Sequence, residues 1–207
     1  MKLADMTLTN YLDLLKSDAP APGGGSVSAL SAAQGAALVS MVCELTIPKE
    51  KFAEYKELCT EVRDEIIEVY NELVIGIDKD TDAFNKLSAA FKMPKTSEEE
   101  KAERSRAIQA ATIGATEVPY ETMAVCMKGL EITKKIVGKS NPGASSDLGV
   151  AALNLLAGLK GAYLNVKINV PSIKDEAVKA RFAGAEELVS KAEVLAAEIY
   201  NDVLAAL

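Results

Sequence analysis

The sequence predicts an all-α protein, a multihelical bundle built around long antiparallel helices. Alanine, the residue with the highest helix propensity, makes up about one residue in six. Between a few clusters of proline and glycine, apolar residues recur every three or four positions, as they do on the buried face of a helix. Because no linker is long enough to divide the 207 residues, we expect a single helical domain that spans residues 1–207.

Short stretches rich in glycine, proline, asparagine and serine mark the ends of the expected helices. These stretches fall at 17–25, 92–97, 138–146 and 170–174. The segments between them predict helices at 7–16, 26–45, 48–91, 97–137, 147–166 and 175–207. Within the fourth of these, Pro119 should start or kink the second half, because proline removes one helical hydrogen bond.

The segment 48–91 carries an apolar stripe from Phe52 to Phe91, with steps of three and four residues typical of a coiled coil. Over about forty residues, such a helix spans roughly 60 Å, which is more than the width of a domain of this size. The helix needs packing partners along its whole length, and a second copy of the chain is a natural one. We therefore expect a homodimer.

The uncharged segment 19–43 contains a helix with two faces that can both be buried. The first face consists of Ser28, Ala32, Ala36 and Ser40, and the second of Val27, Leu30, Ala37, Met41 and Leu45. Burial of both faces fits a dimer, although the helix can also be the central helix of a monomer. Alanine and serine make the segment too weakly apolar for a bilayer core, so we expect no membrane partner.

Composition excludes several classes of function. The chain has 30 acidic and 23 basic residues and 5% aromatic residues, which provides no basic surface for nucleic acid. It has no histidine, so imidazole catalysis and histidine zinc ligands are excluded. Cys43, Cys59 and Cys126 form no CxxC pair and are odd in number, as expected for reduced thiols. The first residues do not resemble a signal peptide, so we expect a cytoplasmic protein.

Asp80 interrupts the apolar stripe and is the first candidate catalytic residue. Helical spacing places its carboxylate among Leu73, Ile77 and Phe84, where loss of hydration raises the pKa of a carboxyl. Such a group can act as general acid or base near neutral pH. Asp78 and Asp82 share another, wetter face. In the alternative interpretation, the helix ends before Asp78 and all three carboxylates are solvated.

The loop PAPGGGS, residues 20–26, immediately precedes a helix and is a candidate ligand-binding loop. Gly23, Gly24 and Gly25 permit the close approach of a flat or anionic ligand to the backbone. Ser26 is a plausible N-cap, and the start of the helix offers N–H groups to an anion. No GK[ST] follows, so this is not a phosphate-binding Walker A loop. A tight turn without a ligand is the alternative.

Two further polar groups are candidates for substrate binding. Asn141 and Asp147 delimit the loop NPGASSD, which has the composition of a helix cap. Asn165 and Asn169 lie four residues apart, so their amides share a face and can read the edge of a heterocycle. Each of these residues can instead serve only to fix a turn of the chain.

Lys95 is the last candidate for substrate binding. It follows the break at Pro94, and together with Arg104 and Arg106 it can meet an anionic tail of a ligand. The segment TSEEEKAER also has the pattern of an ordinary capped helix start with a solvated face.

These motifs occur in the same order in a known family. The segments PAPGGGSVSAL, SMVCELT, IDKDTDAFNKLSAAFKMPK, NPGASSDLGVAAL and GAYLNVKIN resemble the cyclodeaminase/cyclohydrolase family, which includes the C-terminal half of formiminotransferase-cyclodeaminase and short bacterial methenyltetrahydrofolate cyclohydrolases. The resemblance implies an all-helical homodimer that binds a tetrahydrofolate derivative and uses no metal or redox cofactor. It also implies that Asp80, the second aspartate of the DxDxxAF motif, is the proton donor. The first aspartate is Asp78, which we expect to assist by orienting Asp80 or by binding the pterin.

The function implied by the resemblance is hydrolysis of 5,10-methenyltetrahydrofolate to 10-formyltetrahydrofolate. One carboxyl can take a proton from water and return it to the leaving nitrogen, because the carbon is already electrophilic. A formimidoyltetrahydrofolate cyclodeaminase that releases ammonia is the alternative reaction at the same site. A non-catalytic folate-binding helical dimer, or a coiled-coil interaction module, is the alternative outside catalysis. The absence of a formiminotransferase half from this chain favours the hydrolysis.

Overall fold

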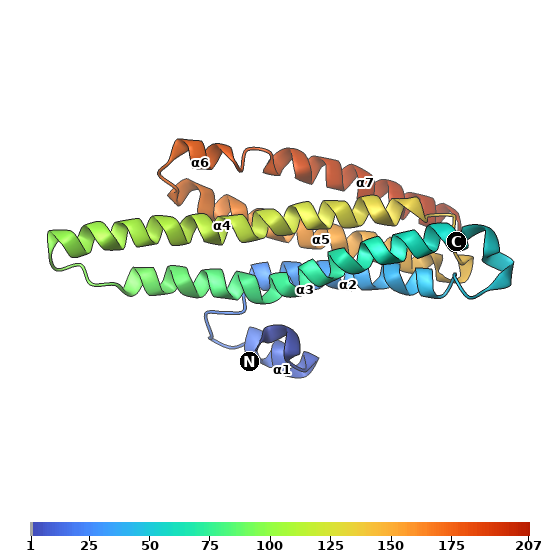
Figure 1. Ribbon diagram of the computed structural model, residues 1–207, viewed down its shortest axis with the longest axis horizontal. Helices are drawn as coiled ribbons and strands as arrows, with labels where there is room; N and C mark the ends of the chain where they lie inside the picture. The colour runs from blue at the N-terminus through green and yellow to red at the C-terminus, as the bar shows by residue number, and fades with distance from the viewer. Residues whose placement is uncertain (1) are drawn as a thin grey trace.

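The computed structural model describes residues 2–207, which form an elongated bundle of α-helices with no β-strand in that range (Figure 1). The α-helices are α1 (Leu8–Leu15), α2 (Gly24–Glu44), α3 (Lys56–Lys92), α4 (Glu98–Lys135), α5 (Ser145–Asn169), α6 (Glu176–Ala180) and α7 (Ala185–Ala205). Short 3₁₀ turns are η1 (Leu3–Asp5), η2 (Glu50–Tyr55), η3 (Pro142–Ala144) and η4 (Val170–Ser172). The predicted all-α bundle is confirmed.

The centre of the bundle is the antiparallel pair α2 and α5, flanked by α3 and α4, with α7 packed on α4 and α5. Glycines allow this close approach. A β-carbon on Gly158 of α5 would lie 2.6 Å from the carbonyl oxygen of Ser28, and one on Gly35 of α2 would lie 2.8 Å from that of Ala151. Only glycine fits at these two crossing points, because it has no side chain to hold the backbones apart.

Helices α3 and α4 form a long hairpin whose loop lies at one end of the bundle, while the C-terminus lies at the other end (Figure 1). The start of α4 is fixed by a capping box. The hydroxyl of Ser97 accepts a hydrogen bond from the N–H of Glu100 at 3.1 Å, and the Glu100 carboxylate accepts one from the N–H of Ser97 at 3.0 Å.

Helix α4 continues through Pro119 instead of breaking there. Proline has no N–H to donate to the carbonyl four residues earlier, which is that of Ala115. The side-chain amide of Asn169, at the end of α5, donates to this carbonyl at 2.9 Å. Asn169 therefore satisfies the acceptor that Pro119 leaves open.

Two long helices predicted from the sequence are interrupted in the structure. The helix predicted for 48–91 begins only at Lys56, because the backbone of Phe52 is not helical (φ −119°, ψ 21°) and the preceding residues form η2. The helix predicted for 175–207 is divided into α6 and α7. Phe182, which lies between them, is buried and packs edge to face on Tyr120 with 5.4 Å between ring centroids.

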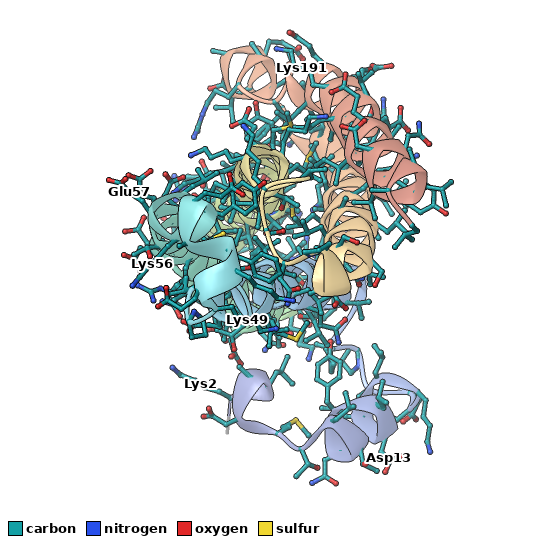
Figure 2. All side chains as sticks on the ribbon, turned by 90° about the vertical axis from the view of Figure 1, so that its right-hand side faces the viewer. Lys2, Asp13, Lys49, Lys56, Glu57 and Lys191 are labelled. Carbon is teal, nitrogen blue, oxygen red and sulfur yellow. The ribbon has the colours of Figure 1, made fainter. Side chains whose placement is uncertain are left out.

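The N-terminal segment lies on one side of the bundle, opposite the α7 side that carries Lys191 (Figure 2). Lys2 and Asp13 mark this segment in the figure, apart from the other helices. Asp78 of α3 attaches it, because one carboxylate oxygen accepts the N–H of Leu3 at 2.6 Å and the other that of Ala4 at 3.4 Å. Tyr11 adds a buried apolar contact in a small cluster with Ala29 and Ile77.

Helix α2 is long and apolar enough to cross a membrane, the one such helix within the part of the chain that the structure describes. In the structure, 56% of its most apolar window is buried inside the bundle. The face with Ser28, Ala32 and Ala36 is buried, whereas Val27 and Met41 of the second face are exposed. Burial within one chain is thus confirmed for only one of the two predicted faces.

Candidate active site

Asp80 of α3 lies beside the start of α2, where Ser26 holds its carboxylate. The Oδ2 atom of Asp80 accepts hydrogen bonds from the backbone N–H of Ser26 at 3.0 Å and from the Ser26 hydroxyl at 3.3 Å. Burial raises the pKa of Asp80 above its usual value, and the two hydrogen bonds from Ser26 partly offset that increase. One oxygen is thus positioned by Ser26, and the Oδ1 atom is left for other partners.

Of the three glycines in the loop, Gly25 is the one at which a side chain cannot be accommodated. A β-carbon on Gly25 would overlap the carboxylate of Asp80, whereas one on Gly24 would lie 3.6 Å from the Asn165 amide nitrogen and one on Gly23 would meet nothing within 4 Å. The prediction that Ser26 is the N-cap is wrong, because α2 begins at Gly24 with Gly23 as the N-cap residue. The Ser26 hydroxyl lies 2.8 Å from the carbonyl oxygen of Ile77 and so ties α2 to α3.

A cavity of about 330 Å³ lies in front of this carboxylate. It is lined by Pro20, Ala21, Gly23, Gly24, Gly25, Asp80, Phe84, Leu87, Ala115, Asn165, Ile168 and Asn169. Asp80 is the one titratable side chain among these residues. A single carboxyl with a raised pKa therefore faces a surface of glycine backbone, apolar side chains and two amides.

Asn165 and Asn169 both line the cavity, as the sequence predicts. The amide nitrogen of Asn165 donates to the carbonyl of Gly161 at 2.9 Å, and that of Asn169 donates to Ala115. Each asparagine thus uses one side-chain N–H to fix the backbone, which is the role given above as the alternative to ligand binding. Among the described residues, neither side-chain oxygen has a hydrogen-bond partner, so each remains available to a donor on a ligand.

Asp78 does not line the cavity, although the sequence predicts that it assists Asp80. Its carboxylate accepts the backbone N–H groups of the N-terminal segment. A two-residue step along a helix rotates the side chain to a different face, which explains the different partners. Asp82 is exposed, as expected for the wetter face.

Asn141 and Asp147, which the sequence predicts as substrate-binding residues, lie within one chain at the end of the bundle opposite Asp80. Asn141 is buried, and it accepts the N–H of Gly143 at 3.1 Å while its own N–H donates to Thr46 at 3.0 Å. Helix α2 separates this end from Asp80 by about 30 Å, because twenty residues rise 1.5 Å each. Asp147 lies in the first turn of α5, where a carboxylate stabilises the helix dipole.

Lys95 lies in the exposed loop between α3 and α4, outside the cavity. The cavity wall contains Phe84, which helical spacing already predicts beside Asp80, and Leu87 of the apolar stripe, which was not predicted as a site residue. Their spacing of four and seven residues from Asp80 is the signal that places them on the same helix face. The three cysteines are buried, and burial raises the pKa of Cys43 and Cys126 to about 12, so neither is an activated thiol.

Comparison with known proteins identifies the family. The sequence profile of formiminotransferase-cyclodeaminase matches residues 7–187. The chain belongs to this family. Its fold is similar to that of formiminotetrahydrofolate cyclodeaminase from Thermotoga maritima, with a TM-score of 0.81 and 25% identity over 100% of this chain and 98% of that one. The resemblance inferred from the motifs is confirmed.

Two kinds of family member are similar in sequence. A methenyltetrahydrofolate cyclohydrolase of Methylorubrum extorquens is 39% identical over 198 residues, which is 95% of both chains. The formimidoyltransferase-cyclodeaminase of Gallus gallus is 39% identical over 160 residues, 77% of this chain and 29% of that protein. That of Dictyostelium discoideum is 34% identical over 92% of this chain and 35% of its own length. The chain thus spans about a third of the length of these cyclodeaminases.

Proposed function

We propose that this protein hydrolyses 5,10-methenyltetrahydrofolate to 10-formyltetrahydrofolate. The observation that carries the proposal is Asp80, a half-buried carboxyl with a raised pKa and the one titratable group among the residues that line the cavity. The similarity to a methenyltetrahydrofolate cyclohydrolase over 95% of both chains supports hydrolysis as the main activity.

The proposed mechanism uses Asp80 first as a base and then as an acid. The substrate carries its one-carbon unit as an amidinium cation between two nitrogens, so this carbon accepts water without a Lewis acid. Asp80 removes a proton as the water oxygen bonds to the carbon, and it then gives that proton to the ring nitrogen as the carbon–nitrogen bond breaks. The remaining hydroxyl proton leaves to solvent as the formyl C=O forms, so the reaction releases one proton in total. Oδ2 is held by Ser26, so Oδ1 is the oxygen that exchanges the proton. We propose no cofactor.

The cavity wall suits the flat pterin ring of such a substrate. The glycine loop lets the ring approach the backbone, and the side-chain oxygens of Asn165 and Asn169 can accept its N–H groups. Apolar side chains such as Phe84 exclude water around the reacting carbon, which strengthens the electrostatic effect of Asp80.

Replacement of Asp80 tests the proposal. We expect the purified wild type to consume methenyltetrahydrofolate, measured by the decay of its absorbance, and Asp80→Asn to lose about a hundred- to ten-thousandfold in kcat while it still binds folate. Asp82→Asn is the matched control, because Asp82 lies two residues away and is exposed. Near-wild-type turnover by Asp80→Asn would show that this carboxyl is not the acid–base group, as in a non-catalytic folate-binding protein.

A cyclodeaminase is the second candidate, favoured by the 0.81 TM-score to a formiminotetrahydrofolate cyclodeaminase. In that reaction, the same carboxyl would protonate a departing amine as the ring closes. An ammonia assay with the formimino substrate, run beside the absorbance assay, separates the two. Faster ammonia release than methenyl hydrolysis at equal enzyme concentration would replace our proposal by the deaminase.

We further propose that the protein acts as a homodimer through the exposed, uncharged face of α2. Val27 and Met41 of α2 and Leu45 directly after it are 38–40% exposed, and α5 adds the more exposed apolar residues Leu164 and Ile168. Each chain carries a net charge of −7, so two copies repel each other electrostatically. This repulsion is weakest across a contact surface that has no carboxylates. Light scattering should give about twice the 21.9 kDa of one chain, and Met41→Asp should lower that mass. A wild-type mass of one chain would contradict the dimer.

A further inference from the structure

The wall of the cavity continues along the α3–α4 hairpin toward its loop. Phe84, Leu87 and Phe91 follow Asp80 at steps of four, three and four residues, so they share its face of α3. The two phenylalanines are 39% and 54% exposed. The eleven residues from Asp80 to Phe91 cover about 16 Å of helix. This track is apolar, and it starts at the candidate catalytic carboxyl.

The far end of the track carries Arg104 of α4. One of its terminal N–H groups donates to the carbonyl of Phe91 at 3.1 Å, and its guanidinium carbon lies 5.9 Å from the centre of the Phe91 ring. Helix α4 therefore runs alongside the track: its Ala115 lines the cavity near Asp80, and its Arg104 lies eleven residues closer to the hairpin loop.

Arg104 has more donors than partners. Its Nε atom is buried and has no hydrogen-bond partner among the described residues. No carboxylate in the described part of the chain forms an ion pair with it, although the chain has 30 acidic residues. A guanidinium has five N–H donors and matches a carboxylate with two parallel hydrogen bonds. Apart from the bond to Phe91, no terminal N–H group of Arg104 has a partner among the described residues, so these groups can bind an acceptor from outside the chain.

We propose that this track is a subsite for the benzoylglutamate arm of the substrate, with the benzoyl ring against Phe84 and Phe91 and a glutamate carboxylate on Arg104. The inference rests on the proposed folate substrate. The order of groups along the arm matches the track, because the aromatic ring follows the reacting end and the carboxylates come last. Arg104, rather than the exposed Lys95 of the hairpin loop, is the main anchor.

Comparison of two substrates tests the subsite. Methenyltetrahydropteroate has the benzoyl ring but no glutamate. We expect Arg104→Gln to raise KM for methenyltetrahydrofolate about ten- to hundredfold, the range for a hydrogen bond to a charged group. The kcat for methenyltetrahydrofolate and the KM for methenyltetrahydropteroate should not change. Arg106→Gln is the matched control, because Arg106 is exposed on the same helix. Arg104→Lys keeps the charge and should restore part of the difference.

An equal change in KM for both substrates would overturn the subsite, because an arginine with a purely structural role cannot distinguish a substrate with glutamate from one without it. No change in either KM would overturn it as well, because Arg104 would then make no contact with the glutamate. Circular dichroism checks that Arg104→Gln is folded. Calorimetry with p-aminobenzoylglutamate and p-aminobenzoate tests the subsite without turnover. Binding of the first that is lost in Arg104→Gln, in a protein that hydrolyses no methenyl substrate, would keep the subsite and reject the proposed reaction. Hydrolysis of methenyltetrahydrofolate in which Arg104→Gln affects both substrates equally would keep the proposed reaction and reject the subsite.

Discussion

Gly25 and Asp80 are in such close contact that a β-carbon at position 25 would occupy the space of the carboxylate. Gly25→Ala should therefore displace Asp80 from its hydrogen bonds to Ser26. A displacement of about 1 Å at a catalytic group can cost about a hundredfold in rate, and we expect kcat to fall by that order.

Gly114→Ala is the control for Gly25→Ala, because a β-carbon there meets nothing within 4 Å. This variant should keep wild-type kinetics. Wild-type turnover in Gly25→Ala, measured by methenyl absorbance decay, would mean that Asp80 can move aside without loss.

The raised pKa of Asp80 predicts the pH dependence of stability. The folded protein binds the Asp80 proton more tightly than the unfolded chain, so this contribution to stability is fully present below the unfolded pKa and is lost as the pH rises through the folded pKa. Asp80→Asn has no such titration. The Tm of Asp80→Asn, relative to wild type, should therefore rise from acidic to neutral pH in calorimetry.

Asp82→Asn serves again as the control, because it makes the same substitution at an exposed position two residues away. A Tm difference between Asp80→Asn and wild type that stays constant with pH would show that Asp80 titrates like an ordinary aspartate.

The bond between Asp78 and the N-terminal backbone predicts a local effect. Asp78→Ala removes the acceptor of the Leu3 and Ala4 N–H groups, so these amides should exchange faster with deuterium. The loss of stability should be about 1.5–3 kcal/mol, as for hydrogen bonds to a charged group. Hydrogen exchange by mass spectrometry measures the change. Unaltered protection of residues 2–16 would show that the apolar contacts of Tyr11 alone hold the segment.

The pairing of Asn169 with the carbonyl of Ala115 predicts a coupled effect on stability. Asn169→Ala leaves this carbonyl without its donor and should lower the free energy of unfolding by about 1–2 kcal/mol. In a Pro119→Ala background, the restored backbone N–H can bond the carbonyl, and the same change should cost less. Urea unfolding of the four proteins measures the difference. Equal costs in both backgrounds would refute the coupling.

Local periodicity was sufficient to predict the all-α fold and the environment of Asp80. Ile77 and Phe84, its apolar neighbours on α3, lie three and four positions away, and that spacing is set by the helix itself. The contact between Gly25 and Asp80 joins two different helices, so no spacing along the sequence specifies it. The steric reason for the glycine was therefore visible only in the structure.

The position of the loop that carries Asn141 and Asp147 also could not be predicted from spacing. Asn141 and Asp147 belong to a motif that resembles the family, but a motif does not state at which end of a bundle its loop lies. The turn at Phe182 was missed because a buried aromatic contact with Tyr120, and not a local breaker alone, interrupts the helix there. Tertiary packing decides such positions, whereas propensity decides the interior of long helices.

The glycine crossings of α2 and α5 determine which parts of the molecule can move. Gly35 and Gly158 each lie opposite a backbone carbonyl of the other helix, so a slide of one helix past the other would drive side chains into the backbone. The two helices must therefore shift together as one rigid body, and with them Gly25 and Asn165. Any widening of the cavity to admit a substrate then falls to the α3–α4 hairpin, whose loop end carries Phe91 and Arg104.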